Sequence, residues 1–364
     1  MFAFPINAEE ITDQIMDDIN KEFSDFENSI PESIKSFFPK EILEGNIKDF
    51  SVNSISQYDF LEYVTNYLLS YLPIITKNLA NLLVLIIIVS IFNTFKGSFE
   101  TEGLKQAFSI CSTLCVSITV FSIVSSIVDS CTNFLSILCN TMNCFTPVMS
   151  AMYIMTGSIT SAGVSNASMM LFLSIVENFV LYGLVPVIKV CLCFSIVGSI
   201  SGYADLSAIS RTIKSFFTTI CVFLISIFSF VMSFQSVLSH SIDTLSLRTA
   251  KFAIGSFIPV VGGFIGESLK TISASLSLIK SSCGIIAIIV IVLLILPIII
   301  SLFLNKLTFD IISGISKTLG TDNETKICDE ASSICSFILS IVSLCSVVFI
   351  FSLTIFIKSS IEIG

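Results

Sequence analysis

The sequence predicts an all-α, polytopic helical membrane protein with about seven spans and an amphipathic helical region at its N-terminus. The first observation is composition. The mean hydropathy is +0.94 and only 12% of residues are charged, whereas about a quarter are charged in soluble domains. The second is the run 281–305, in which 25 consecutive residues carry no charge. About 20 apolar helical residues cross a hydrocarbon core of roughly 30 Å, and the same signal recurs along the chain.

The N-terminal part is acidic, and we expect it to lie in water outside the membrane. The first 70 residues hold 14 acidic residues and four lysines, a net charge of −10, while the other 294 residues carry +1. Nucleic acids and anionic lipid surfaces attract clustered Lys and Arg, so we expect neither as a partner of this part. Residues 1–8 lack the basic and then apolar pattern of a secretory signal peptide.

Apolar residues at helical spacing between the acids predict an amphipathic helix over 8–30, which Pro31 and Pro39 break. A polar stretch follows, and a second helix is predicted to end at Pro73. We therefore divide the chain into an acidic amphipathic helical region, residues 1–76, and a multi-span membrane domain, residues 77–364.

Seven spans are predicted in the membrane domain. Residues 130–176 carry no charge but are rich in Ser, Thr, Asn and Cys, which favours close helix packing and contact with protein or water over lipid. A turn is expected over 157–168. The fourth span contains Glu177 and Pro186, and its length predicts a tilted or broken helix. The expected spans are 79–95, 107–128, 135–155, 169–200, 216–234, 285–304 and 334–357.

The segment 243–282 differs from the spans on either side. It mixes acids and bases with an apolar stripe at helical spacing. This pattern predicts an amphipathic helix that lies at the membrane interface or lines a water-filled space. We expect its residues 264–280 and the Ser/Thr-rich helices of 130–200 to face protein neighbours or water.

The sequence contains few residues arranged for catalysis or for metal binding. Twelve cysteines lie mostly in apolar stretches, no C-x-x-C pair occurs and His240 is the sole histidine, so neither a zinc site nor a disulfide framework is expected. Common hydrolase and nucleotide-binding motifs are absent. We expect no catalytic, cofactor-binding or metal-binding residues and no enzyme activity. An intramembrane serine protease would need His240 opposite a serine, a weak alternative.

Glu177 is the candidate functional residue within a span, because a charge at membrane depth costs about 2.5–3.5 kcal/mol and is rarely kept without a role. It could bind a cation or a proton in a conduit. It could equally sit near a helix end, hydrogen-bonded to Ser or Asn neighbours. Lys189 is 12 residues away, about 18 Å along a helix, so the two cannot pair within one straight helix. A secondary transporter is the main alternative function that this residue suggests.

The stretch DTLSLRTAKFAIGSFIPVVGGFIGESLKTISASLSLIKSSCG, which begins at Asp243, resembles the stage III sporulation protein AE family of endospore-forming bacteria. The resemblance implies a multi-pass protein of the mother-cell membrane facing the forespore. It would belong to a channel complex that links the two cells, with other membrane subunits as partners. Further copies of the chain itself are a separate candidate partner. The residues that carry the resemblance include Arg248, Lys251, Pro259, Gly262, Lys280 and Gly284.

Overall fold

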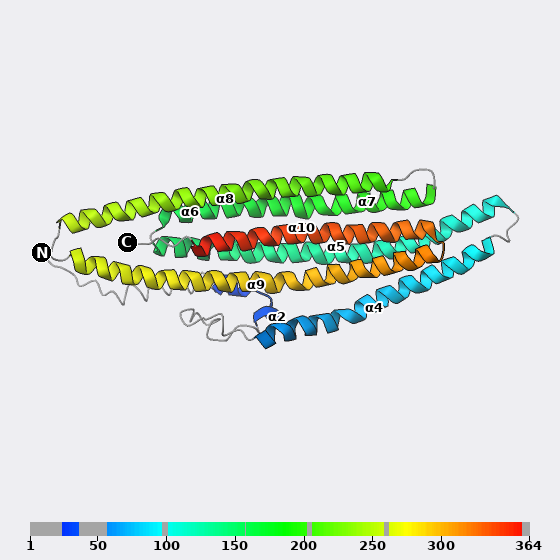
Figure 1. Cartoon of the computed structure of the whole chain (residues 1–364), viewed down its shortest axis with the longest axis horizontal. Coiled ribbons are helices and arrows are strands. Elements are labelled where there is room, and N and C mark those ends of the chain that lie inside the picture. The colour runs from blue at the N-terminus through cyan, green and yellow to red at the C-terminus, as the bar shows by residue number, and fades with distance from the viewer. Residues whose placement is uncertain are drawn as a thin grey trace.

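The computed structural model describes residues 24–35, 57–96, 101–156, 158–201, 206–257 and 262–358. Within these ranges the chain is helical between short turns and contains no strand, as predicted. Figure 1 shows the long helices side by side in an elongated bundle. The helices are α2 (Glu32–Lys35), α4 (Gln57–Lys96), α5 (Glu102–Met155), α6 (Ile159–Ile175), the π-helix η3 (Val176–Leu181), α7 (Tyr182–Ser201), α8 (Ser207–Phe257), α9 (Gly262–Thr318) and α10 (Asp322–Lys358).

Six helical segments in the described residues are long and apolar enough to cross a membrane, one fewer than predicted. The difference lies in α5, a single 54-residue helix that contains both the second and the third predicted span. The polar residues between those spans do not break the helix, because their hydroxyls bond to carbonyls one turn earlier. Ser130 Oγ donates to the Ser126 carbonyl at 2.9 Å, and Thr132 Oγ1 to that of Asp129 at 3.0 Å.

Two predicted breaks are wrong. Helix α4 continues through Pro73, since membrane helices tolerate a proline inside a span. The turn expected over 157–168 is much shorter, since α6 already begins at Ile159. The break predicted in the fourth span is confirmed: η3 interrupts the α-helical geometry between α6 and α7.

The amphipathic segment 243–282 is helical on both sides of residues 258–261, but it is not a separate helix. Its first part continues α8, and its second part begins α9. The described side chains in this segment are those of residues 243–245, 249 and 277–282. Residues 8–23 of the helix predicted over 8–30, residues 45–56 of the polar stretch predicted as a linker over 45–57, and Pro259 lie outside the described residues.

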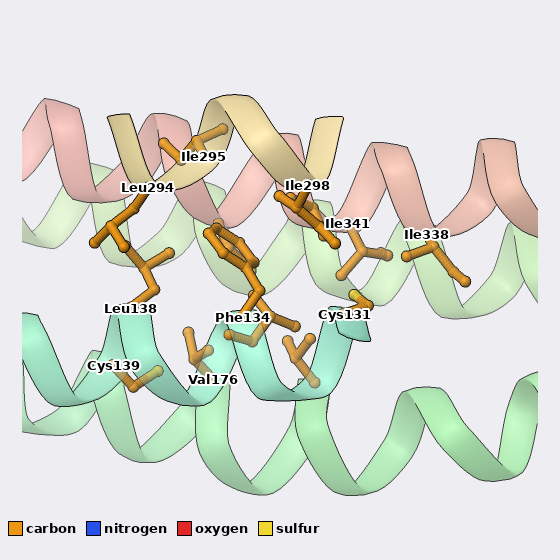
Figure 2. Packing of buried hydrophobic residues seen from close by; sticks show 14 of the residues in the cluster. Cys131, Phe134, Leu138, Cys139, Val176, Leu294, Ile295, Ile298, Ile338 and Ile341 are labelled. Atoms are coloured by element: carbon orange, nitrogen blue, oxygen red, sulfur yellow. The ribbon is translucent and has the colours of Figure 1, made fainter. Parts of the chain in front are cut away.

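Helices α9 and α10 form the antiparallel hairpin at the centre of the bundle. More than half of the most apolar stretch of each, 56%, is buried, against 22–29% for the four other candidate spans. Gly320 closes the hairpin turn with a φ of +71°, a conformation that glycine adopts without strain. In Figure 2, Phe134 and Leu138 of α5 lie beside Leu294, Ile295 and Ile298 of α9.

The acidic N-terminal region packs onto this bundle through its apolar residues. Phe26, Ile30 and Ile34 are buried, and the ring centroids of Phe26 and Phe145 of α5 are 4.8 Å apart. Figure 1 shows α2 beside α9. Pro31 follows the helical residues 24–29, so the predicted break at this proline is confirmed.

Candidate functional site

One face of α5 is polar where the surrounding helices are apolar. Between residues 122 and 143, every exposed side chain is polar, and these side chains recur at helical spacing. Part of the face is hollowed into a shallow groove along residues 118–133. We call this surface the α5 polar face. It consists of Ser122, Ser126, Asp129, Ser130, Asn133, Ser136, Asn140 and Asn143.

The α5 polar face lies at the depth of the most apolar part of the bundle. Figure 2 places Phe134 and Leu138, on the buried side of the same stretch of α5, next to Leu294, Ile295 and Ile298. Those α9 residues stand in the middle of the charge-free run 281–305. A charge-free run of this length marks the hydrocarbon core, so the polar face is level with that core.

Other helices expose apolar side chains, which are suited to contact with lipid. Helix α8 exposes large apolar side chains along its length, among them Phe223, Phe230 and Phe234, and α4 exposes Ile87, Ile88 and Ile91. On α5 itself, no large apolar side chain is exposed between Phe121 and Ile154. The contrast divides the outside of the bundle into apolar faces suited to lipid and one polar face that is not.

The carboxylate and the three amides of this face have no partner inside the described part of the chain. No hydrogen bond or ion pair there engages the carboxylate of Asp129 or the side-chain amides of Asn133, Asn140 and Asn143. Moving an amide from water into hydrocarbon without a partner costs about 4–8 kcal/mol. Contact with lipid would therefore be strongly unfavourable, and water or another protein surface must cover this face.

Glu177 lies in η3, next to α5, and is half-buried. Its charge is within electrostatic range of Cys139, the neighbour of Asn140 in the sequence, and Figure 2 shows Cys139 close to Val176. The predicted hydrogen bond to a Ser or Asn neighbour is not present in the described residues; Asn178 Nδ2 instead donates to the Ser174 carbonyl at 2.8 Å. Glu177 and Lys189 form no ion pair, as their spacing predicts.

A π-helix is uncommon and often marks a functional site. Because η3 widens the helix at Glu177, it changes the direction in which the carboxylate and its neighbours project. Glu177 thus combines two features of a functional residue in a membrane protein, a charge at membrane depth and an irregular helix. It lies on a segment packed against α5, near the buried Cys139 and not among the exposed residues of the α5 polar face.

Lys280 and Gly284 meet at one contact between α9, α10 and α5. Lys280 is fully buried, and its Nζ lies 4.3 Å from the ring centroid of Tyr153 and 5.2 Å from that of Phe356, within the range of cation–π attraction. One turn later, a Cβ added to Gly284 would lie 2.3 Å from Ile357 Cγ1. Glycine therefore permits the close approach of α9 to α10.

The remaining motif residues are only partly visible. Arg248 and Lys251 lie on α8, and Gly262 begins α9, but their side chains are not among those described. His240 lies on α8, and its side chain is likewise not described. Among the described residues, no group of three or more His, Cys, Asp or Glu side chains is arranged to hold a metal ion.

Two sets of buried polar contacts that join distant segments were missed by the sequence reasoning. Lys214 Nζ of α8 lies 2.8 Å from Glu330 Oε1 of α10 and donates to Ser333 Oγ at 2.6 Å; Ser210 Oγ also donates to Glu330. Asp243 of α8 accepts hydrogen bonds from the backbone N–H groups of Thr160 and Ser161, both at 3.0 Å.

Asp243 thereby caps the N-terminus of α6, where Ser158 makes no side-chain cap. Both sets of contacts fasten α8 to its neighbours: the ion pair to α10 and the cap to α6. Their geometry is that of structural contacts within the bundle. The α5 polar face and Glu177 are therefore the groups whose chemistry is left open to an outside partner.

Comparisons with known proteins identify the family of the chain. The family model for stage III sporulation protein AE matches residues 33–360, nearly the whole chain. The chain belongs to this family. It is also similar to the stage III sporulation protein AE of Bacillus subtilis (strain 168), with 23% identity over 354 residues that cover 96% of this chain and 86% of the relative. No solved structure matches the chain.

Family membership indicates a sporulation role. The six apolar helices indicate that the protein resides in a membrane as a multi-pass protein.

Proposed function

We propose that this chain is a conduit-forming or structural membrane subunit of a sporulation-specific channel complex that links the mother cell and the forespore. In this proposal it lies in the mother-cell membrane that faces the forespore, has no catalytic role, and acts with other membrane subunits and further copies of itself. The α5 polar face carries the proposal, because a polar surface at hydrocarbon depth calls for water or protein next to it.

The buried contacts support a structural role for the rest of the bundle. Lys214, Glu330 and Asp243 bind groups of the same chain and so hold the helices together. A rigid scaffold of this kind can present α5 to a conduit or to a neighbouring subunit. The sporulation family supports the setting in which this surface would be used.

Affinity purification from sporulating cells tests the proposal. The tagged full chain is extracted in mild detergent, with and without starvation, and the copurifying proteins are identified. We expect other sporulation membrane proteins, in a starvation-dependent manner. Replacing Asn133 and Asn140 on the α5 polar face with Leu should reduce their recovery or block forespore gene expression, whereas Phe223→Leu on α8 should change neither. Recovery of the chain alone under both conditions would contradict the proposal.

A secondary transporter for a small solute is the second candidate, and the π-helix at Glu177 favours it. Transporters often place a charge at an irregular point of a membrane helix. In this case Glu177→Gln should abolish ion-coupled uptake while assembly with other subunits is unaffected. Intact uptake in Glu177→Gln, combined with failed assembly of variants in the α5 polar face, would favour the channel complex.

A further inference from the structure

The α5 polar face is long enough to cross the hydrocarbon core. Ser122 and Asn143 mark its ends, and the rise of about 1.5 Å per residue makes the face roughly 32 Å long, close to the thickness of that core. A binding patch for one polar group would need only one or two turns. A polar track of this length instead matches a path that leads from one side of the membrane to the other.

The track lies on the outside of the monomer, so one copy cannot enclose it. A serine hydroxyl or an asparagine amide both donates and accepts hydrogen bonds. The polar faces of two identical copies can therefore bind the same water molecules without repelling each other. Closed symmetry is the usual arrangement of identical subunits. In a ring with α5 turned inwards, the apolar faces of α4 and α8 would remain free for lipid.

Asp129 is the one acidic residue of the α5 polar face, and it lies about a third of the way along the track. No ion pair within the described residues neutralises it. Glu177 on the adjacent η3 adds negative charge near Cys139, which lies on the buried side of the same stretch of α5. Rings of acidic side chains favour cations in water-filled pores.

We propose that copies of this chain surround a water-filled passage lined by the α5 polar face, and that Asp129 makes this passage favour cations over anions. The inference rests on the proposed conduit role. It adds that α5 lines the passage, that further copies of the chain complete its wall and that Asp129 sets its preference for cations.

Thiol labelling in sporulating-cell membranes tests the passage and its charge preference together. Asn133→Cys is introduced into the full chain after the exposed Cys111, Cys115 and Cys193 and the half-buried Cys144 have been replaced by Ser. Two water-borne reagents, a trimethylammonium and a sulfonate methanethiosulfonate, are compared by rate. We expect both to react, with a cationic-to-anionic rate ratio about tenfold above that of a free thiol, since local charge raises cation concentration by tenfold or more.

Adding Asp129→Asn should return this ratio to that of the free thiol. Glu102→Gln is the matched control, an acid-to-amide change on the same helix but at an exposed position outside the polar face, and it should leave the ratio unchanged. Phe230→Cys on the apolar face of α8 should react with neither reagent. A ratio that Asp129→Asn does not alter would overturn the role of Asp129, and no reaction at Asn133→Cys would overturn the passage.

Oxidative cross-linking tests whether copies close the wall. Asn133→Cys should form covalent dimers and larger species of this chain, and Phe230→Cys should not. If cysteines placed along the polar face are labelled but none forms a cross-link, another subunit must complete the wall. That result would overturn the claim that copies of this chain surround the passage. The proposed function fails separately: the passage could be present in a chain that copurifies with no other sporulation protein.

Discussion

The buried ion pair between Lys214 and Glu330 gives a quantitative prediction about stability. The two side chains are only 7% and 9% exposed, so removing one partner leaves the other charge without compensation in a poorly solvated place. Glu330→Leu or Lys214→Met alone should lower the free energy of unfolding by about 3–5 kcal/mol, whereas the double variant should lose far less, because buried pairs replaced together by apolar residues are often nearly neutral. The coupling energy between the two sites should therefore be large.

Thermal unfolding in detergent, followed with a dye that fluoresces on reaction with thiols, is a suitable assay. The chain has no Trp, but many of its cysteines, including Cys131, Cys283 and Cys345, are buried and become reactive on unfolding. Breaking the exposed pair of Lys105 and Glu102 by Glu102→Gln is the control and should cost at most about 1 kcal/mol. Additive effects of the two single variants in the double variant would refute the reasoning.

Two further predictions concern helix contacts, both measured by the same assay. Gly284→Ala should destabilise the protein by about 1–3 kcal/mol, because the new methyl group overlaps Ile357, and adding Ile357→Ala should recover part of the loss; no recovery would place the strain elsewhere. Asp243→Ala should cost about 1–3 kcal/mol by leaving two backbone N–H groups at the start of α6 unpaired. Asp243→Asn, which keeps an acceptor, should cost less, and equal losses would contradict the cap.

The membrane character of the helices could be predicted from local sequence alone. Charge-free apolar runs such as 281–305 have one stable solution in a bilayer, a helix with its backbone bonds satisfied internally. A tilted or broken helix was predicted over 169–200, because the segment was too long for one straight span and too short for two; the position of the π-helix at Glu177 was not predicted. The continuity of α5 was missed, since Ser and Thr often end helices in water, whereas Ser130 and Thr132 bond back to the helix here.

Contacts between distant segments could not be predicted in this way. Lys214 and Glu330 are 116 residues apart, and Asp243 caps a helix that begins more than 80 residues earlier. Helical spacing fixes which residues share a face but not which helix that face meets. The α5 polar face, by contrast, is visible in the sequence as a polar stripe over 122–143; its depth and exposure required the packing of α5 against α9 and α10.

Spin-label accessibility at Asn133 tests the central claim, that the α5 polar face is not covered by lipid. A label at Asn133 is compared with one at Phe230, in the full chain in native membranes, by collision with oxygen, which concentrates in lipid, and with a water-soluble nickel chelate. We predict a low ratio of oxygen to nickel accessibility at Asn133, or low accessibility to both if protein covers it, and a high ratio at Phe230. An equally high ratio at both positions would place the polar face in lipid and contradict the account.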